Sequence, residues 1–102
     1  MRCLLPSTAF LLCSACLFLS GCHQGSADAG AAVFKKNCYG CHGSTTTQAF
    51  AAPLSGYLKT QGGHSEAETR RIIREGEGNM PPFGRRLSRR ELDDLIAYMK
   101  LL

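Results

Sequence analysis

The clearest regularity in this chain is a run of hydrophobic positions near its C-terminal end. Four apolar residues recur there at intervals of three or four, namely Leu92, Leu95, Ile96 and Met99. This spacing places them on one face of an α-helix. Ser88, followed three residues later by Glu91, has the sequence of a capping box, in which each side chain bonds to the backbone of the other residue. We therefore predict a helix over residues 89–101.

A weaker helical pattern covers residues 29–39, where Gly30 and Phe34 fall on one face. Asp28 is a suitable N-cap for this helix. Gly30 is unexpected, because glycine inside a helix is about 1 kcal/mol less favourable than alanine. The close approach of another helix would explain it.

A third helix is predicted over residues 66–75, with Ser65 and Glu68 as a second capping box and Gly76 as a natural stop. Its apolar positions are few, so it should bury only a narrow stripe. No segment alternates between polar and apolar residues over more than a few positions, as a half-buried strand would. The pattern therefore indicates an all-α domain with three main short helices.

The first part of the chain differs in composition, because residues 1–21 are predominantly apolar. Their last three residues, together with Cys22, form a Leu-Ser-Gly-Cys sequence. This segment resembles a bacterial lipoprotein signal peptide. The resemblance implies cleavage before Cys22, a lipid-modified Cys22, a short tether over residues 22–28 and a domain over residues 29–102. The alternative is an uncleaved anchor helix near the lower length limit for a membrane span. In both cases the domain is exported and faces the periplasm or the cell exterior.

Six cysteines in a small chain can indicate three disulfides, but only Cys38 and Cys41 lie outside the apolar segment and its end. They belong to Cys-Tyr-Gly-Cys-His, the C-x-x-C-H form of covalent haem attachment. In that chemistry both thiols add to one porphyrin and His42 binds the iron. Met80 offers the thioether expected as the second axial ligand. The motif predicts one covalent haem c.

Two other chemistries use paired cysteines. A redox-active dithiol would place its C-x-x-C at a helix start in a βαβ unit, whereas Cys38 follows a predicted helix with no strand before it. A structural zinc ion needs four ligands, and beyond Cys38, Cys41 and His42 the exported part offers only His23 and His64. The sequence therefore supports both of these interpretations less well than it supports haem attachment.

Two residues compete with Met80 as the distal iron ligand. Met99 lies on the apolar stripe of the last predicted helix, where methionine usually serves packing. His64 lies next to two glycines, just before a helix cap. Met80 is preferred, because Gly78 and Pro81 favour an extended loop that brings its sulfur to the iron.

From Gly30 to its C-terminus the chain resembles a small single-haem cytochrome c of class I. Gly30 and Phe34, with Leu95 and Tyr98, match the residues at which the first and last helices cross in that family. The resemblance implies the cytochrome c fold, in which short helices pack round a covalently bound haem. For a domain this small, the cofactor would supply much of the core.

The same resemblance implies three further pocket residues. Pro53 would accept the imidazole N–H of His42 through its carbonyl oxygen, and such a bond orients the ring and raises its basicity. Leu54 would pack on the haem. Phe83 belongs to the stretch that matches the distal methionine loop of the family.

These features predict a one-electron carrier and not an enzyme, because two protein ligands leave no iron site for a substrate. The alternative is a haem-based sensor in which a small ligand displaces Met80, since Gly76, Gly78 and Gly84 allow the distal loop some mobility. A peroxidase is disfavoured, because no distal base is evident.

The chain carries a formal net charge of +4, with arginines gathered in its C-terminal half. These arginines have three possible roles. They could be solvated and neutralise the haem propionates, they could form a docking face for an acidic redox protein, or they could contact anionic lipid. Expected partners are a donor dehydrogenase or reductase, an acceptor oxidase or reductase, and the membrane through Cys22. Nucleic acid is not expected, and the protein would be a monomer or a subunit of a larger complex.

Overall fold

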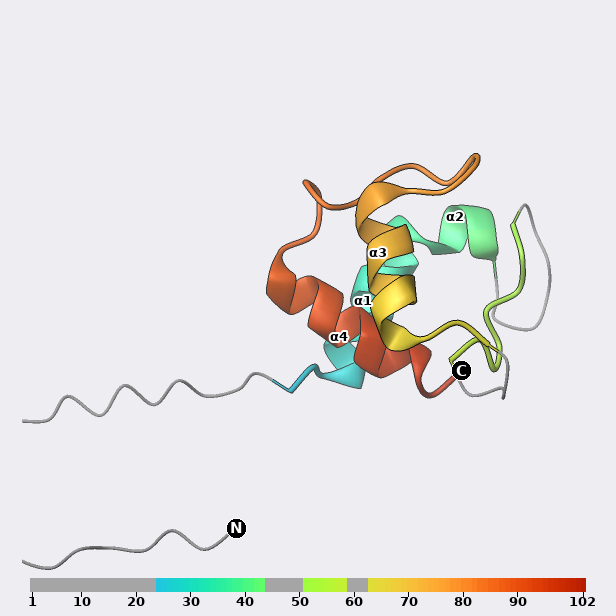
Figure 1. Ribbon diagram of the computed structural model, residues 1–102. Coiled ribbons are helices and arrows are strands. Elements are labelled where there is room, and N and C mark those ends of the chain that lie inside the picture. Colours follow the sequence, from blue (N-terminus) through green and yellow to red (C-terminus); the bar gives the residue numbers. More distant parts are fainter. Residues whose placement is uncertain (1–23, 44–50, 59–62) are drawn as a thin grey trace, which may run out of the picture.

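The computed structural model describes residues 24–43, 51–58 and 63–102 (Figure 1). Four helices lie in these ranges: α1 (Ala27–Asn37), α2 (Tyr39–His42), α3 (Glu66–Glu75) and α4 (Arg89–Met99). Outside the helices, the only β-type pairing in these ranges is an isolated bridge between Glu77 and Met80. No helix of the described part is both long and apolar enough to span a bilayer. The predicted signal peptide and Cys22 lie outside the described residues and remain predictions.

Helix α1 begins two residues earlier than its sequence predicts. Its N-cap is Ser26, not Asp28, and the Ser26 Oγ accepts a hydrogen bond from the Ala29 N–H at 3.3 Å. A tertiary contact selects this residue, because the Ser26 N–H donates to Oδ1 of Asp94 at 2.7 Å. Asp28 therefore lies inside the first turn, where its charge suits the positive end of the helix dipole.

The tether predicted over residues 22–28 is consequently too long. Gly25 lies so close to the backbone of Asp93 that a Cβ atom at Gly25 would overlap it. Ser26 is bonded to α4, and the next two residues are helical. The packed domain thus begins at about residue 25 rather than 29.

The other two predicted helices have nearly the expected bounds. Helix α3 begins after Ser65 and ends before Gly76, as predicted. Its capping box is half formed, because the Ser65 Oγ accepts the Glu68 N–H whereas the Glu68 carboxylate pairs with Nδ1 of His64 at 3.0 Å. Helix α4 has a complete capping box between Ser88 and Glu91 and ends at Met99, two residues early.

The core forms where α1 crosses α4 (Figure 1). Gly30 lies against the backbone carbonyl of Asp94, and an added Cβ would stand 2.7 Å from the Cβ of Tyr98. Next to this contact the rings of Phe34 and Tyr98 meet at 5.4 Å between centroids, inclined at 53°. Leu95 is 1% exposed and Phe34 3%. The crossing predicted from these four residues is confirmed.

Ion pairs connect α3 to α4. Arg70 of α3 contacts Oδ1 of Asp93 at 2.7 Å and Oε1 of Glu66 at 3.0 Å. Lys100, just after α4, contacts the other oxygen of Glu66 at 2.7 Å. These charged groups are partly exposed, so each ion pair alone should contribute little to the stability of the fold. Together they position α3 across α4.

We expect Gly30→Ala to lower the unfolding free energy of the haem-loaded protein by about 1–3 kcal/mol, because the methyl group overpacks the crossing. Gly40→Ala is the matched control, since Gly40 is also helical and nothing lies within 4 Å of an added Cβ. Denaturant titration followed by circular dichroism measures both. Equal losses in the two variants would contradict the close contact at Gly30.

Candidate cofactor site

The Cys-Tyr-Gly-Cys-His motif is a helical turn. Cys38 ends α1 and caps α2, and its carbonyl accepts the N–H groups of Cys41 at 3.2 Å and of His42 at 2.9 Å. Residues three and four positions apart lie on one side of a helix. The turn therefore presents both sulfurs and the imidazole to the same space.

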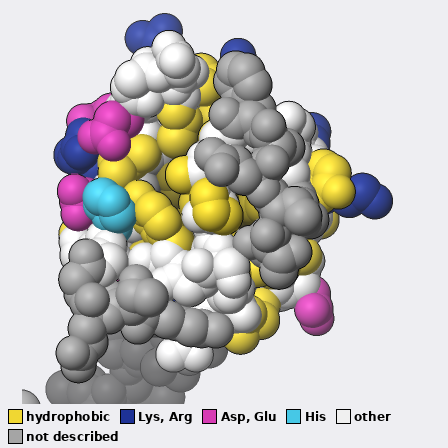
Figure 2. Space-filling model, turned by 90° about the vertical axis from the view of Figure 1, so that its right-hand side faces the viewer, with side chains coloured by type: hydrophobic (Ala, Val, Ile, Leu, Met, Phe, Trp, Pro, Cys, Tyr) yellow, Lys and Arg dark blue, Asp and Glu magenta, His cyan; other side chains and the backbone are white. Residues whose placement is uncertain are grey.

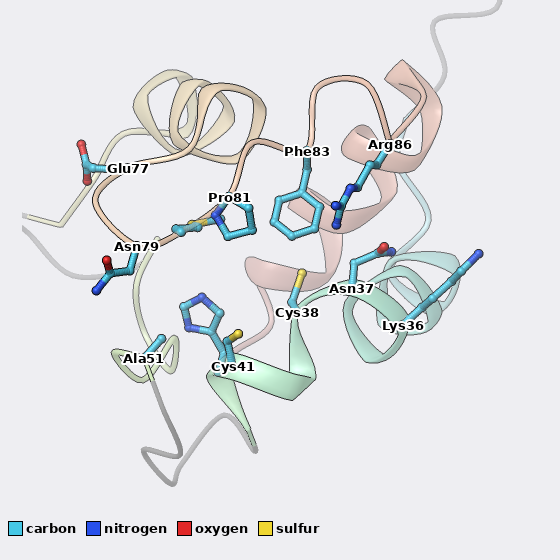
Figure 3. Close-up of a pocket in the computed structure, with 12 residues that line it drawn as sticks. Lys36, Asn37, Cys38, Cys41, Ala51, Glu77, Asn79, Pro81, Phe83 and Arg86 are labelled. Atoms are coloured by element: carbon cyan, nitrogen blue, oxygen red, sulfur yellow. The ribbon is translucent and has the colours of Figure 1, made fainter.

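That space is a cleft with an outer cavity of about 570 Å³ and a deeper one of about 150 Å³. Figure 3 shows Cys38 and Cys41 on one wall of the outer cavity, with Pro81 and Phe83 opposite them. The two cavities share Cys38, His42, Glu77 and Met80. Small-molecule and cofactor pockets measure roughly 300–1,000 Å³, so a cofactor of considerable size fits.

The deeper cavity has mainly apolar walls. Its side chains come from α1, α3, α4 and the segment after α2, and include Phe34, Leu54, Tyr57, Ile73, Leu95 and Met99. Figure 2 shows hydrophobic side chains gathered in the middle of the right-hand face of Figure 1, with charged groups at its edges. The sequence indicated Leu54, which is 9% exposed, but gave no sign that Tyr57 or Thr69 would line the site.

The orientation of the His42 ring differs in one respect from the prediction. Its Nδ1 lies 2.8 Å from the carbonyl oxygen of Ala52, not that of Pro53. The Ala51 N–H donates to the Cys41 carbonyl at 2.9 Å, which holds this segment beside α2 and brings the Ala52 carbonyl to the ring. Pro53 is exposed and lines neither cavity. Ala52 therefore takes the part expected of Pro53.

Met80 lies at the end of a tight turn. Glu77 and Met80 exchange two backbone hydrogen bonds, of 3.1 and 2.9 Å, round Gly78, whose φ is +57°. A left-handed residue at such a turn favours glycine. Met80 is half-buried and lines both cavities.

The distal loop is fastened to the end of α3. The Phe83 N–H donates to the Ile73 carbonyl at 2.8 Å, and the Gly84 N–H to the Arg74 carbonyl at 3.0 Å. Gly76 has a φ of +77°, and an added Cβ would stand 2.6 Å from the Met80 oxygen. Gly76 and Gly84 are therefore positions of close packing rather than of the mobility that the sequence suggested.

The structure separates the two rivals of Met80. His64 lines neither cavity, and it stacks on Tyr57 with 4.8 Å between ring centroids while pairing with Glu68. Met99 is 4% exposed and forms part of the deep wall. His64 is thus not part of the cavity walls, whereas Met99 lies within the cleft.

The cysteines do not have the environment of a reactive dithiol. Burial, and secondarily the neighbouring Cys41, raises the pKa of Cys38 to about 11. Catalytic C-x-x-C pairs need a lowered thiol pKa, so this environment opposes that reading. In the described ranges no group of three or more His, Cys, Asp or Glu side chains is placed to hold a metal ion.

Comparison with known proteins gives concordant results. Residues 25–99 match the family model described as cytochrome c oxidase, cbb3-type, subunit III. Cytochrome c6 of Limnospira maxima is 32% identical over 81 residues, covering 74% of this chain and 91% of the relative. Cytochrome c6 of a Picosynechococcus species is 29% identical over 109 residues, covering 97% and 92%.

A solved structure, that of cytochrome c6 from the diatom Phaeodactylum tricornutum, superimposes with a TM-score of 0.59 at 29% identity. The match covers 74% of this chain and 91% of the diatom protein. The predicted all-α cytochrome c fold is confirmed.

We expect Gly76→Ala to destabilise the distal loop for two reasons. The backbone at residue 76 has a positive φ, which is strained for alanine, and the added Cβ would collide with the Met80 carbonyl oxygen. Gly78→Ala is the matched control, since Gly78 also has a positive φ but has open space round an added Cβ. The control should lose about 1 kcal/mol from backbone strain, and Gly76→Ala clearly more. Unfolding titrations and limited proteolysis of the loop measure this. A loss no larger at Gly76 than at Gly78 would count against the packing argument.

Proposed function

Because the chain belongs to the cytochrome c family, matching the cbb3-type subunit III model over residues 25–99, we propose that it is a one-electron carrier with His42 and Met80 as axial ligands. Membership of this family makes it an electron-transfer protein rather than an enzyme, and its cofactor is a covalently bound haem c. In this proposal Cys38 and Cys41 form the two thioether links.

One observation carries the proposal. A helical turn with two sulfurs and an imidazole shares a single cleft with a methionine on a fastened loop. The cleft volume suits a large planar cofactor, and its deep wall is apolar. A haem bound there supplies a reversible one-electron couple, and a thioether ligand favours the reduced form. The residues of the chain bind it, orient His42 through the Ala52 carbonyl, and exclude water.

The fastened loop favours a closed iron site over the sensor alternative. If Met80 left the iron through a movement of its loop, the loop would have to separate from the end of α3. Two backbone hydrogen bonds from the loop to α3, and the close contacts of two glycines, oppose that movement. The sensor reading therefore lacks the loose loop on which it depended.

We further propose that the protein is exported and held by a lipid on Cys22, outside a bacterial membrane. Because the packed domain begins at about residue 25, only three residue-to-residue steps separate it from that anchor. At about 3.3–3.6 Å per residue they span roughly 10 Å. The domain would lie next to the bilayer and exchange electrons with redox proteins there, either as a shuttle over short distances or as a fixed subunit.

The axial ligands are tested by absorption spectra of the haem-loaded protein. Ferric haem with a bound methionine shows a weak near-infrared sulfur-to-iron band. We expect this band in the native protein, its loss in Met80→Ala, and its retention in Met99→Ala. Survival of the band in Met80→Ala would exclude Met80, and loss only in Met99→Ala would transfer the role to Met99.

Carbon monoxide separates the carrier from the sensor. The reduced native protein should show little spectral change on addition of the gas, whereas Met80→Ala should bind it at once. An immediate spectral shift in the native protein would favour the sensor function instead.

A further inference from the structure

The loop that carries Met80, residues 77–84, is joined to α3 differently in its two halves. After Met80 it is held by backbone bonds, because the Phe83 and Gly84 N–H groups donate to carbonyl oxygens in the last turn of α3. Before Met80 the backbone bonds stay within the loop, where Glu77 and Met80 pair with each other. The first half of the loop is therefore not fastened to the helix by its own backbone.

A side chain of α3 supplies that fastening. Nη2 of Arg71 donates to Oε1 of Glu77 at 3.3 Å, and Nη1 of Arg71 lies 3.6 Å from Oε2 of Glu75. Figure 3 shows the side chain of Glu77 directed away from the cavity. Arg71 lines neither cavity, so its link to the site runs through Glu77. Because Glu77 and Met80 exchange backbone bonds of 3.1 and 2.9 Å, a contact that holds Glu77 also holds Met80.

The position of the two carboxylates makes this arginine more important than a single ion pair. Glu75 is the last residue of α3, and Glu77 follows two positions later. Carboxylates are unfavourable there, because the helix dipole is negative at its C-terminal end. An exposed ion pair contributes little by itself. Without Arg71, however, Glu77 would also be repelled by Glu75 and by the end of the helix, so the attraction would be replaced by a repulsion.

We propose that Arg71 is a positioning residue that holds the turn of Glu77 and Met80 against α3 and so keeps the side chain of Met80 in the cleft. Two adjacent arginines then connect α3 in two directions, Arg70 to α4 and Arg71 to the loop. The inference rests on the proposed function, because it is read out through the bond between Met80 and the haem iron.

Imidazole, at a pH where it is uncharged, measures how readily the loop opens in the ferric, haem-loaded protein. It binds the iron only when Met80 has left, so its apparent affinity rises in proportion to the population of the open loop. The near-infrared methionine band disappears as imidazole binds, which gives the affinity by titration. At high imidazole concentration the binding rate approaches the rate at which the loop opens.

Arg71→Gln should raise the imidazole affinity about threefold and accelerate opening, because the loop loses an attraction and gains a repulsion. Glu77→Gln should raise the affinity about twofold, because only the attraction is lost. The double variant Arg71→Gln, Glu77→Gln should resemble Glu77→Gln, since removal of the second carboxylate also removes the repulsion. A double variant whose affinity equals the product of the two single effects would contradict the proposal, because the two side chains would then act independently.

Two matched controls separate the link to the loop from charge alone. Glu75→Gln removes the other carboxylate that contacts Arg71, but Glu75 lies on α3 itself. Arg74→Gln removes one positive charge from the same helix, at a residue that forms no ion pair with any described residue. Each should change the imidazole affinity by less than about 1.5-fold. Equal effects of Arg71→Gln and Arg74→Gln would overturn the proposal.

A purely stabilising role for Arg71 within α3 predicts a different result. In that case Arg71→Gln would lower the unfolding free energy and leave the imidazole affinity unchanged, and the proposal would be wrong. A native protein without the methionine band would overturn the proposed iron ligation and this inference together. A native protein with the band, whose variants all bind imidazole alike, would overturn only this inference.

Discussion

The close crossing of α1 and α4 is the contact on which the rest of the molecule depends. Gly30 lets the two backbones meet, and Phe34 and Tyr98 fill the space beside them. Because α1 passes directly into α2 through Cys38, the direction of α1 sets where the two sulfurs and His42 lie. Helix α4 in turn supplies part of the deep wall. A shift at Gly30 would therefore displace the site at both of these walls.

The two sides of the cleft are supported separately. Within the described residues α2 contacts α1, and α3 contacts α4, but α2 makes no contact with α3 or α4. The turn with the cysteines and the loop with Met80 thus face a common space and are joined indirectly, through the crossing of α1 and α4. A cofactor bonded to both sides would connect them directly and would add apolar surface to a small core. We therefore expect cofactor attachment and folding to be coupled.

Capping residues and hydrophobic periodicity in the sequence predicted those helix boundaries that are determined by contacts between neighbouring residues. Helix α3 has its predicted bounds because Ser65 and Gly76 act on their immediate neighbours. The predictions were wrong where a contact with a residue from another segment determines the local structure. Ser26 replaces Asp28 as the cap of α1 because Asp94, 68 residues away, bonds to its backbone. Ala52 replaces Pro53 at His42 because a bond to Cys41 sets the path of that segment.

The charges illustrate the same limit at the candidate site. The sequence shows the arginines but not their partners, so Arg70 and Arg86 look equivalent in it. In the structure Arg70 is paired with two carboxylates, whereas Arg86 lies over Phe83 at the mouth of the cleft. Only three-dimensional packing distinguishes a cation that stabilises the fold from one available to a partner.

The fastening of the distal loop bears directly on the kind of function that the fold supports. An electron carrier works best when its metal site keeps one geometry in both oxidation states, whereas a sensor needs a ligand that leaves. Gly76 and Gly84 looked like hinges in the sequence, yet both lie in close contact with backbone atoms of neighbouring segments. The loop that carries Met80 is thereby bound to α3, and α3 to α4. Moving this loop would disturb a chain of contacts reaching the core, and under the proposal that Met80 binds the iron such an arrangement favours electron transfer over ligand exchange.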